Sequence, residues 1–171
     1  YTNNILGVTY TVDKDNKIIT VTGFDAATAK DLGGVYRIFI SFAEDESLQG
    51  YKVVIVDDAF KDNNYISEVY LGADVTSIGA RAFMNTSNLT KFIVADGGLE
   101  EIKTRAFENA GCIVEGDTVK LNPAIDKKRN GGIQFVLPLA NMKNIEPYAF
   151  KTKGIFRFTE TELEGDEDNR R

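Results

Sequence analysis

The chain has 171 residues, of which 43% are hydrophobic, and its formal net charge is −6. These values suit one folded domain or one short solenoid with a real core, and they argue against a disordered chain. No run of about 18 apolar residues occurs, so the sequence predicts no membrane-spanning helix.

Two residue types are nearly or wholly missing. The chain has no histidine and a single cysteine, Cys112. Without histidine, Ser-His-Asp and Cys-His catalysis and His-ligated zinc are excluded. One cysteine forms neither an internal disulfide nor a Cys-based metal site. We therefore expect no cofactor and no metal, and interpret Cys112 as a small buried hydrophobe.

The first predicted element is a β-hairpin. The chain begins at Tyr1 rather than Met, so we expect a mature or trimmed fragment whose export signal has been removed. Apolar residues then alternate at 8, 10 and 12 and again at 19 and 21, around the polar segment DKDN. DKDNK begins like a calcium loop, but Lys17 stands where the third ligand belongs, which favours a hairpin turn. We expect residues 1–34 to form a hairpin cap on the rest of the chain.

A repeat comes after the hairpin. An isoleucine comes four residues before an Ala-Phe pair in four places, with spacings between the isoleucines of 23, 24 and 43 residues. These positions are Ile55 with Ala59-Phe60, Ile78 with Ala82-Phe83, Ile102 with Ala106-Phe107, and Ile145 with Ala149-Phe150. The third spacing equals one repeat plus an insertion of about 19 residues.

Each repeat also contains an apolar-x-x-apolar-x-apolar segment, as in Ile66-x-x-Val69-x-Leu71. Its period of two predicts a short strand, and strands of successive units are expected to stack in parallel. The isoleucine and alanine of the other segment are four apart, so we place them on one face of a helical turn, with Phe filling the interior. The expected fold is a right-handed β/α superhelix of about four to five coils.

The remaining segments complete the predicted division. Residues 35–159 are assigned to the solenoid, with an insertion at about 109–132 that we interpret as a strand pair with an exposed loop. Residues 160–171 hold six acids and two arginines, so they carry −4 of the net charge. We interpret this acidic tail as a solvated segment.

These motifs resemble the BspA-type leucine-rich repeat family, in which I-x-x-x-A-F is followed by L-x-x-h-x-h in units of about 23 residues. The hairpin at 10–25 and the segment at 50–60 resemble that family as well. The usual Ile-Gly step occurs only at Ile78-Gly79, and no asparagine ladder follows the strands. The resemblance implies an exported or cell-surface bacterial protein used for adhesion and partner binding, and it supplies no catalytic residues.

Catalysis finds little support elsewhere. Two adjacent carboxylate pairs, Asp57-Asp58 and Glu100-Glu101, could in principle serve glycoside hydrolysis, which needs two carboxyl groups flanking one bond. Both pairs fall at predicted turns, where adjacent side chains point apart. We therefore expect no enzyme, with a carboxylate-based glycoside hydrolase as the third hypothesis.

The candidate binding site lies on the outward positions of the strands. The residues between the inward ones should form an apolar row across four strands, and a row of polar residues should flank it. The apolar row is Phe39, Tyr70, Ile93 and Val136, and the polar row is Arg37, Glu68, Lys91 and Gln134. Strand propensity alone would also place such residues there, and the insertion or the hairpin could cover them.

We thus predict a non-catalytic binding module, secreted or at the cell surface, that recognises a protein or a carbohydrate. The alternative is a structural spacer or part of a longer repeat array. Outside the acidic tail the net charge is only −2, with no basic stripe, so we expect no nucleic-acid partner. This segment should not insert into a membrane.

Overall fold

The computed structural model describes residues 7–25, 27, 36–123, 133–153 and 156–160. The predicted acidic tail, apart from Glu160, and residues 124–132 of the insertion lie outside these residues. The elements with described bounds are thirteen β-strands and two short 3-10 helices, η1 (Glu46–Leu48) and η2 (Leu139–Asn141).

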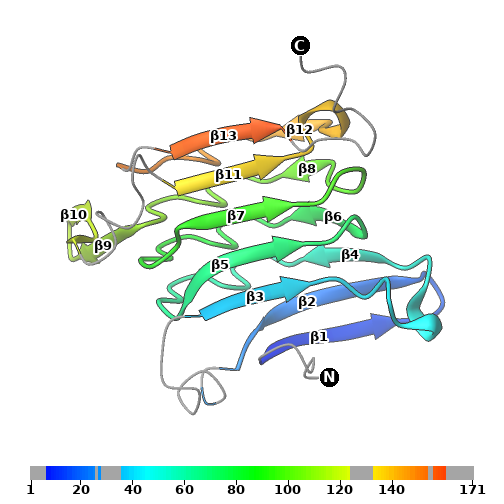
Figure 1. Ribbon diagram of the computed structural model, residues 1–171. Coiled ribbons are helices and arrows are strands. Elements are labelled where there is room, and N and C mark those ends of the chain that lie inside the picture. Colours follow the sequence, from blue (N-terminus) through cyan, green and yellow to red (C-terminus); the bar gives the residue numbers. More distant parts are fainter. Residues whose placement is uncertain (1–6, 26, 28–35, 124–132, 154–155, 161–171) are drawn as a thin grey trace.

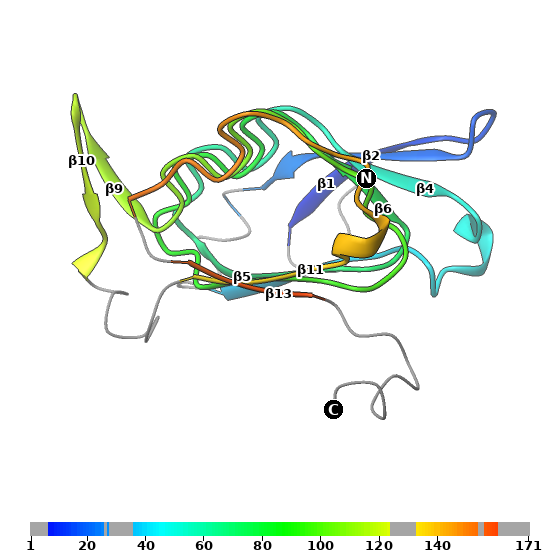
Figure 2. The ribbon, with the colours of Figure 1, turned by 90° about the horizontal axis from the view of Figure 1, so that it is seen from above.

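Two sheets form opposite sides of the solenoid (Figures 1 and 2). The five-stranded sheet has the order β13-β11-β7-β5-β3, and every neighbouring pair in it is parallel. Its strands are β3 (Tyr36–Ile40), β5 (Ile66–Leu71), β7 (Lys91–Val94), β11 (Ile133–Leu137) and β13 (Phe156–Glu160). Parallel stacking of the repeated strands is therefore confirmed.

The six-stranded sheet has the order β1-β2-β4-β6-β8-β12. Its strands are β1 (Val8–Asp13), β2 (Ile18–Phe24), β4 (Lys52–Ile55), β6 (Val75–Ile78), β8 (Glu101–Ile102) and β12 (Asn144–Ile145). The antiparallel hairpin β1–β2 confirms the predicted element, and β2 joins the first repeat through a parallel pairing with β4. Its position at the end of this sheet suits a cap, although the proposed division into 1–34, 35–159 and 160–171 stays a prediction.

The segment after each isoleucine is a chain of turns and not the helical turn that the spacing predicts. Arg81 and Asn85, which flank Ala82-Phe83, have φ angles of 57° and 59°, and Arg105 and Asn109 repeat this geometry at 59° and 59°. A residue in the left-handed region ends a right-handed helix, so the β/α description does not apply to the described repeats.

The turn segments are held by hydrogen bonds between coils. Alternate backbone N–H groups donate to carbonyl groups of the next coil, as Phe60 does to Ala82 at 2.7 Å and Phe83 to Ala106 at 2.8 Å. A helix would use these donors within itself. In this repeat the same N–H groups instead bond neighbouring coils to each other.

Two columns of phenylalanine rings fill the interior. The rings of the Ala-Phe motifs stack nearly parallel, with centroids 5.0 Å apart for Phe60–Phe83, 5.5 Å for Phe83–Phe107 and 5.1 Å for Phe107–Phe150. Phe92 and Phe135, from the five-stranded sheet, meet this column edge-on, for example at 4.7 Å and 82° between Phe92 and Phe107. Edge-to-face and offset stacks are the favoured arrangements of aromatic pairs.

The insertion contains the antiparallel hairpin β9 (Cys112–Glu115) and β10 (Thr118–Leu121), as predicted for a strand pair. In Figure 2 this hairpin stands beside the turn segments, away from the outer face of the five-stranded sheet. Cys112 is buried, in agreement with its interpretation as a small hydrophobe.

Candidate binding surface

The outward residues of the five-stranded sheet lie in register across its strands. Phe39 pairs with Tyr70, Tyr70 with Ile93, and Ile93 with Val136. The backbone thus places the four predicted residues in one continuous row. We call it the apolar row.

The exposed end of the apolar row is aromatic. Phe39 is 44% exposed, and its ring stacks on that of Tyr70 with centroids 4.8 Å apart and planes inclined by 15°. Ile93 and Val136 are half-buried. The ring pair is therefore presented at the sheet surface, on strands β3 and β5.

The polar row is in register too, with Arg37 opposite Glu68, Glu68 opposite Lys91, and Lys91 opposite Gln134. The Glu68 carboxylate lies 3.4 Å from the Arg37 guanidinium and 3.9 Å from the Lys91 ammonium. The side chain of Glu68 is only 17% exposed, whereas those of Arg37 and Lys91 are 60% and 49% exposed. The accessible charge of this row is therefore positive.

Glu68 also links the two rows. The Tyr70 hydroxyl donates to its Oε1 atom at 2.6 Å. This hydrogen bond, together with burial, raises the pKa of the Tyr70 hydroxyl above its usual range, because the bond favours the protonated phenol. Glu68 thus fixes the orientation of the half-buried tyrosine.

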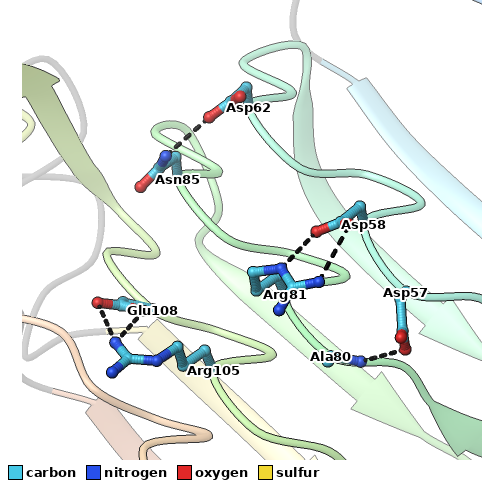
Figure 3. A network of polar contacts seen from close by, with 8 residues as sticks. All are labelled: Asp57, Asp58, Asp62, Ala80, Arg81, Asn85, Arg105 and Glu108. Atoms are coloured by element: carbon cyan, nitrogen blue, oxygen red, sulfur yellow. Dashed lines mark hydrogen bonds and ion pairs between the residues drawn. The ribbon is translucent and has the colours of Figure 1, made fainter.

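Three carboxylates of the two adjacent pairs have structural partners. Asp57 accepts the backbone N–H of Ala80 at 2.8 Å, and Asp58 forms a two-bonded ion pair with Arg81 at 2.8 and 3.2 Å (Figure 3). The Arg81 hydrogen bond lowers the pKa of the Asp58 carboxyl. Glu100 lies 3.2 Å from the Lys143 ammonium. These contacts join neighbouring coils.

The segment DKDNK forms the turn of the β1–β2 hairpin. Asp13 Oδ1 accepts the N–H groups of Asp15 and Asn16 at 3.1 and 3.0 Å, and Oδ2 accepts the Asn16 amide at 2.8 Å. The bonds from Asn16 lower the pKa of the Asp13 carboxyl. Lys17 has a φ of 55°, which closes the turn. The hairpin-turn prediction is confirmed.

A ladder of polar side chains on the turn segments was missed by sequence analysis. Asn85 donates to Asp62 at 2.7 Å, and Asn109 donates to Asn85 at 3.1 Å (Figure 3 shows the first bond). These three residues stand two places after the phenylalanine of the first three repeats, at φ angles of 63°, 59° and 59°. An Asp or Asn at this fixed place was the available signal, because both residues tolerate the left-handed region.

Within the described residues, no cluster of His, Cys, Asp and Glu of a size to hold a metal ion occurs. No helix in that same part of the chain is long and apolar enough to cross a membrane.

Parallel strands that recur in every coil around an aromatic interior define a leucine-rich-repeat fold. Residues 50–124 match the family model of a BspA-type leucine-rich repeat region, which comprises 6 copies. The predicted resemblance is therefore confirmed over this part of the chain. No characterised protein sequence matches the chain.

Three solved structures are similar. A leucine-rich repeat protein from Bacteroides capillosus ATCC 29799 has 20% sequence identity and a TM-score of 0.64, over 94% of this chain and 99% of that one. A leucine-rich cell surface protein from Faecalibacterium prausnitzii A2-165 has 24% identity and a TM-score of 0.47, over 63% and 27% of the two chains. The T. pallidum leucine-rich repeat protein has 17% identity and a TM-score of 0.49, over 88% and 67%. The first of these supports the fold.

Proposed function

We propose that this chain is a non-catalytic binding module, secreted or at the cell surface, whose contact surface is the outer face of the five-stranded sheet. One observation supports this most: the apolar row is continuous over β3, β5, β7 and β11, and its aromatic end is exposed. Contiguous apolar side chains at a surface commonly mark contacts with partners. The BspA-type repeat region supports the location, since the family resemblance implies exported proteins.

The described part of the insertion leaves this face open. The β9–β10 hairpin stands beside the turn segments (Figure 2). A covered row would favour a spacer, whereas an open row favours binding. The row and its two exposed cations also give a partner both apolar and charged contacts.

The size of the face predicts modest affinity. Five strands about 4.8 Å apart span roughly 20 Å, so the face approaches the ~800 Å² per partner of a standard interface only with the help of flanking loops. We therefore expect binding that depends on avidity rather than a tight one-to-one complex.

The test is the double change Tyr70→Ser with Ile93→Ser. A panel of purified extracellular proteins and glycans is screened with the wild-type chain, displayed in many copies on beads, and every hit is re-measured with the variant. Binding should be lost while the melting temperature changes little. Val54→Ser, on the outer face of the other sheet, is the matched control and should keep binding. Unfolding of the double variant, or a screen in which every hit still binds it, would contradict the proposal.

The alternative function, a structural spacer, is supported by an exposed isoleucine in the last coil. Ile145 is 43% exposed, whereas Ile55, Ile78 and Ile102, which hold the same place in earlier coils, are 0% exposed. Another coil stacked on β12 would bury it. If the chain is only a spacer, the Tyr70→Ser/Ile93→Ser variant should lose no binding that the wild type shows. The same experiment therefore distinguishes a spacer from a binding module.

A further inference from the structure

A groove lies away from the outer face of the five-stranded sheet, between the turn segments and the β9–β10 hairpin. The volume of the groove is about 540 Å³, and its turn side is lined by Asp62, Asn64, Asn85, Ser87 and Asn88. Cys112, Ile113, Val114 and Asn122 line the hairpin side. This volume falls within the range of small-ligand sites, which is roughly 300–1,000 Å³.

The polar lining is held in place by bonds between coils. Asn85 is fixed between Asp62 and Asn109. Asn88 donates to the Asn64 carbonyl at 2.5 Å and accepts from the Asn122 amide at 3.0 Å. Asn122 also donates to the Ser87 carbonyl at 2.9 Å. A lining that is already ordered loses little entropy when a ligand binds.

Some polar groups of the groove are left for a ligand. Within the described part of the chain, neither the side-chain amide of Asn64 nor the Ser87 hydroxyl has a hydrogen-bond partner. Only the backbone carbonyls of these two residues take part in the bonds just described. In the Asp62 carboxylate, the Oδ1 atom accepts a hydrogen bond from the Asn85 amide. The groove therefore combines free donors and acceptors with a rigid amide frame.

The opposite wall is partly apolar. Val114 is 38% exposed and Ile113 is half-buried. A ligand that fits both walls must present hydroxyl or amide groups on one side and C–H groups on the other. A pyranose ring has this character, since its hydroxyls both donate and accept and its axial faces are C–H surfaces.

The charge of the groove lining narrows the chemical class of the ligand further. Among the described residues that line the groove, Asp62 is the only charged one, and none of them is a cation. Sulfated or carboxylated sugars would therefore meet a negative charge without a positive partner. A peptide added as a strand would need a long free edge, but β9 has only four residues, and the N–H of Cys112 already donates to Asn109 at 3.1 Å.

We propose that this groove binds a short neutral oligosaccharide, with Asn64, Ser87 and Asp62 as contact residues and the Ile113–Val114 wall against the C–H face of a sugar ring. This site is separate from the strand face and does not depend on its function. Since none of the described residues that line the groove is aromatic, we expect weak binding, in the millimolar range.

The test uses cellotetraose, maltotetraose and chitotetraose as probes in a titration of the ¹⁵N-labelled protein followed by NMR. At least one sugar should shift the amide signals of residues 62–64, 85–88 and 112–114 together. The variant Asn64→Ala with Ser87→Ala should weaken binding about tenfold, because it removes two hydrogen-bonding side chains and leaves the coil-to-coil bonds intact.

The strand-face variant Tyr70→Ser with Ile93→Ser is the matched control and should bind the sugar as the wild type does. The proposal is overturned if none of the three sugars shifts these signals, or if the Asn64–Ser87 variant binds unchanged. It is overturned as well if the groove signals respond only to peptides or only to an anionic sugar such as heparin. The strand-face proposal survives each of these results.

Discussion

The ring of Phe83 lies almost parallel to that of Phe107, with centroids 5.5 Å apart and planes inclined by 8°. Phe83 is completely buried, and Phe60 stacks on its other face at 5.0 Å. Because both neighbours are fixed in their own coils, a cavity at this place collapses poorly. Phe83→Ala should therefore lower the free energy of unfolding by about 3–5 kcal/mol.

Among the described rings, Phe150 is the last of the same column, and it is only half-buried. Phe150→Ala should cost less than Phe83→Ala, because less apolar surface is removed from its packing. Urea titrations of the two variants give the comparison. Equal midpoints would contradict a stack in which Phe150 is the outer member.

Gly98 should tolerate no side chain. A Cβ atom there would lie 1.8 Å from the Ala73 carbonyl oxygen of the preceding coil. Since the obstacle is backbone, the coils themselves must move apart, and Gly98→Ala should cost about 1–3 kcal/mol or more. Thermal unfolding measures the loss. Recovery on adding Ala73→Gly would show that the side chain of Ala73, and not its carbonyl, is the obstacle.

The Asp58–Arg81 ion pair should stabilise the fold in a pH-dependent way. The pKa of Asp58 is lower in the folded chain, so this contribution is present above the unfolded value of about 3.9 and is lost as the pH falls through the folded value. Asp58→Asn should therefore lower the urea midpoint slightly at pH 7. At an acidic pH below the folded value, the variant and the wild type should coincide. A deficit of the same size at both pH values would assign the effect to packing.

Tyr70 should titrate above the usual tyrosine pKa of about 10. The stabilisation that comes from its protonated form is present below about pH 10 and is lost as the pH rises through the folded value. A spectrophotometric titration, taken as the difference between the wild type and Tyr70→Phe, isolates this residue. Glu68→Gln should move the midpoint down, since it removes a negative charge beside the phenolate. An unchanged midpoint would mean that Glu68 does not hold the hydroxyl.

The strand register was predictable because the repeat has a fixed length. Once Val69 is assigned to the interior, period two turns Tyr70 outward, and equal spacing turns Ile93 outward in the next unit. The structure places Tyr70 opposite Ile93 as this reasoning requires. The burial of Glu68 between two cations was not predictable, because it depends on side-chain conformations across three strands.

The turn segments show where sequence reasoning fails. A spacing of four between Ile78 and Ala82 suits a helical turn as well as two successive turns, and the apolar pattern is the same in both. The distinction lies in Arg81 and Asn85, whose left-handed conformations are stabilised by bonds to the next coil. Those bonds form only after stacking, so a single repeat does not reveal them. For the same reason the ladder from Asp62 to Asn109, and with it the groove, was found only in the structure.

The hydrogen bonds between the turn segments give the solenoid an electrical polarity. The N–H groups of Asp58, Phe60 and Asp62 all donate to the following coil, and those of Phe107 and Asn109 continue in the same direction. Every second peptide unit in these segments is therefore aligned along the stack, with its carbonyl toward the hairpin end and its N–H toward β12. Peptide dipoles of about 3.5 D add when they are aligned, so the column has a negative pole near the first coil and a positive pole near the last. A coil that joins the β12 end in the same orientation brings carbonyl oxygens to that pole, whereas a reversed coil would set donor against donor.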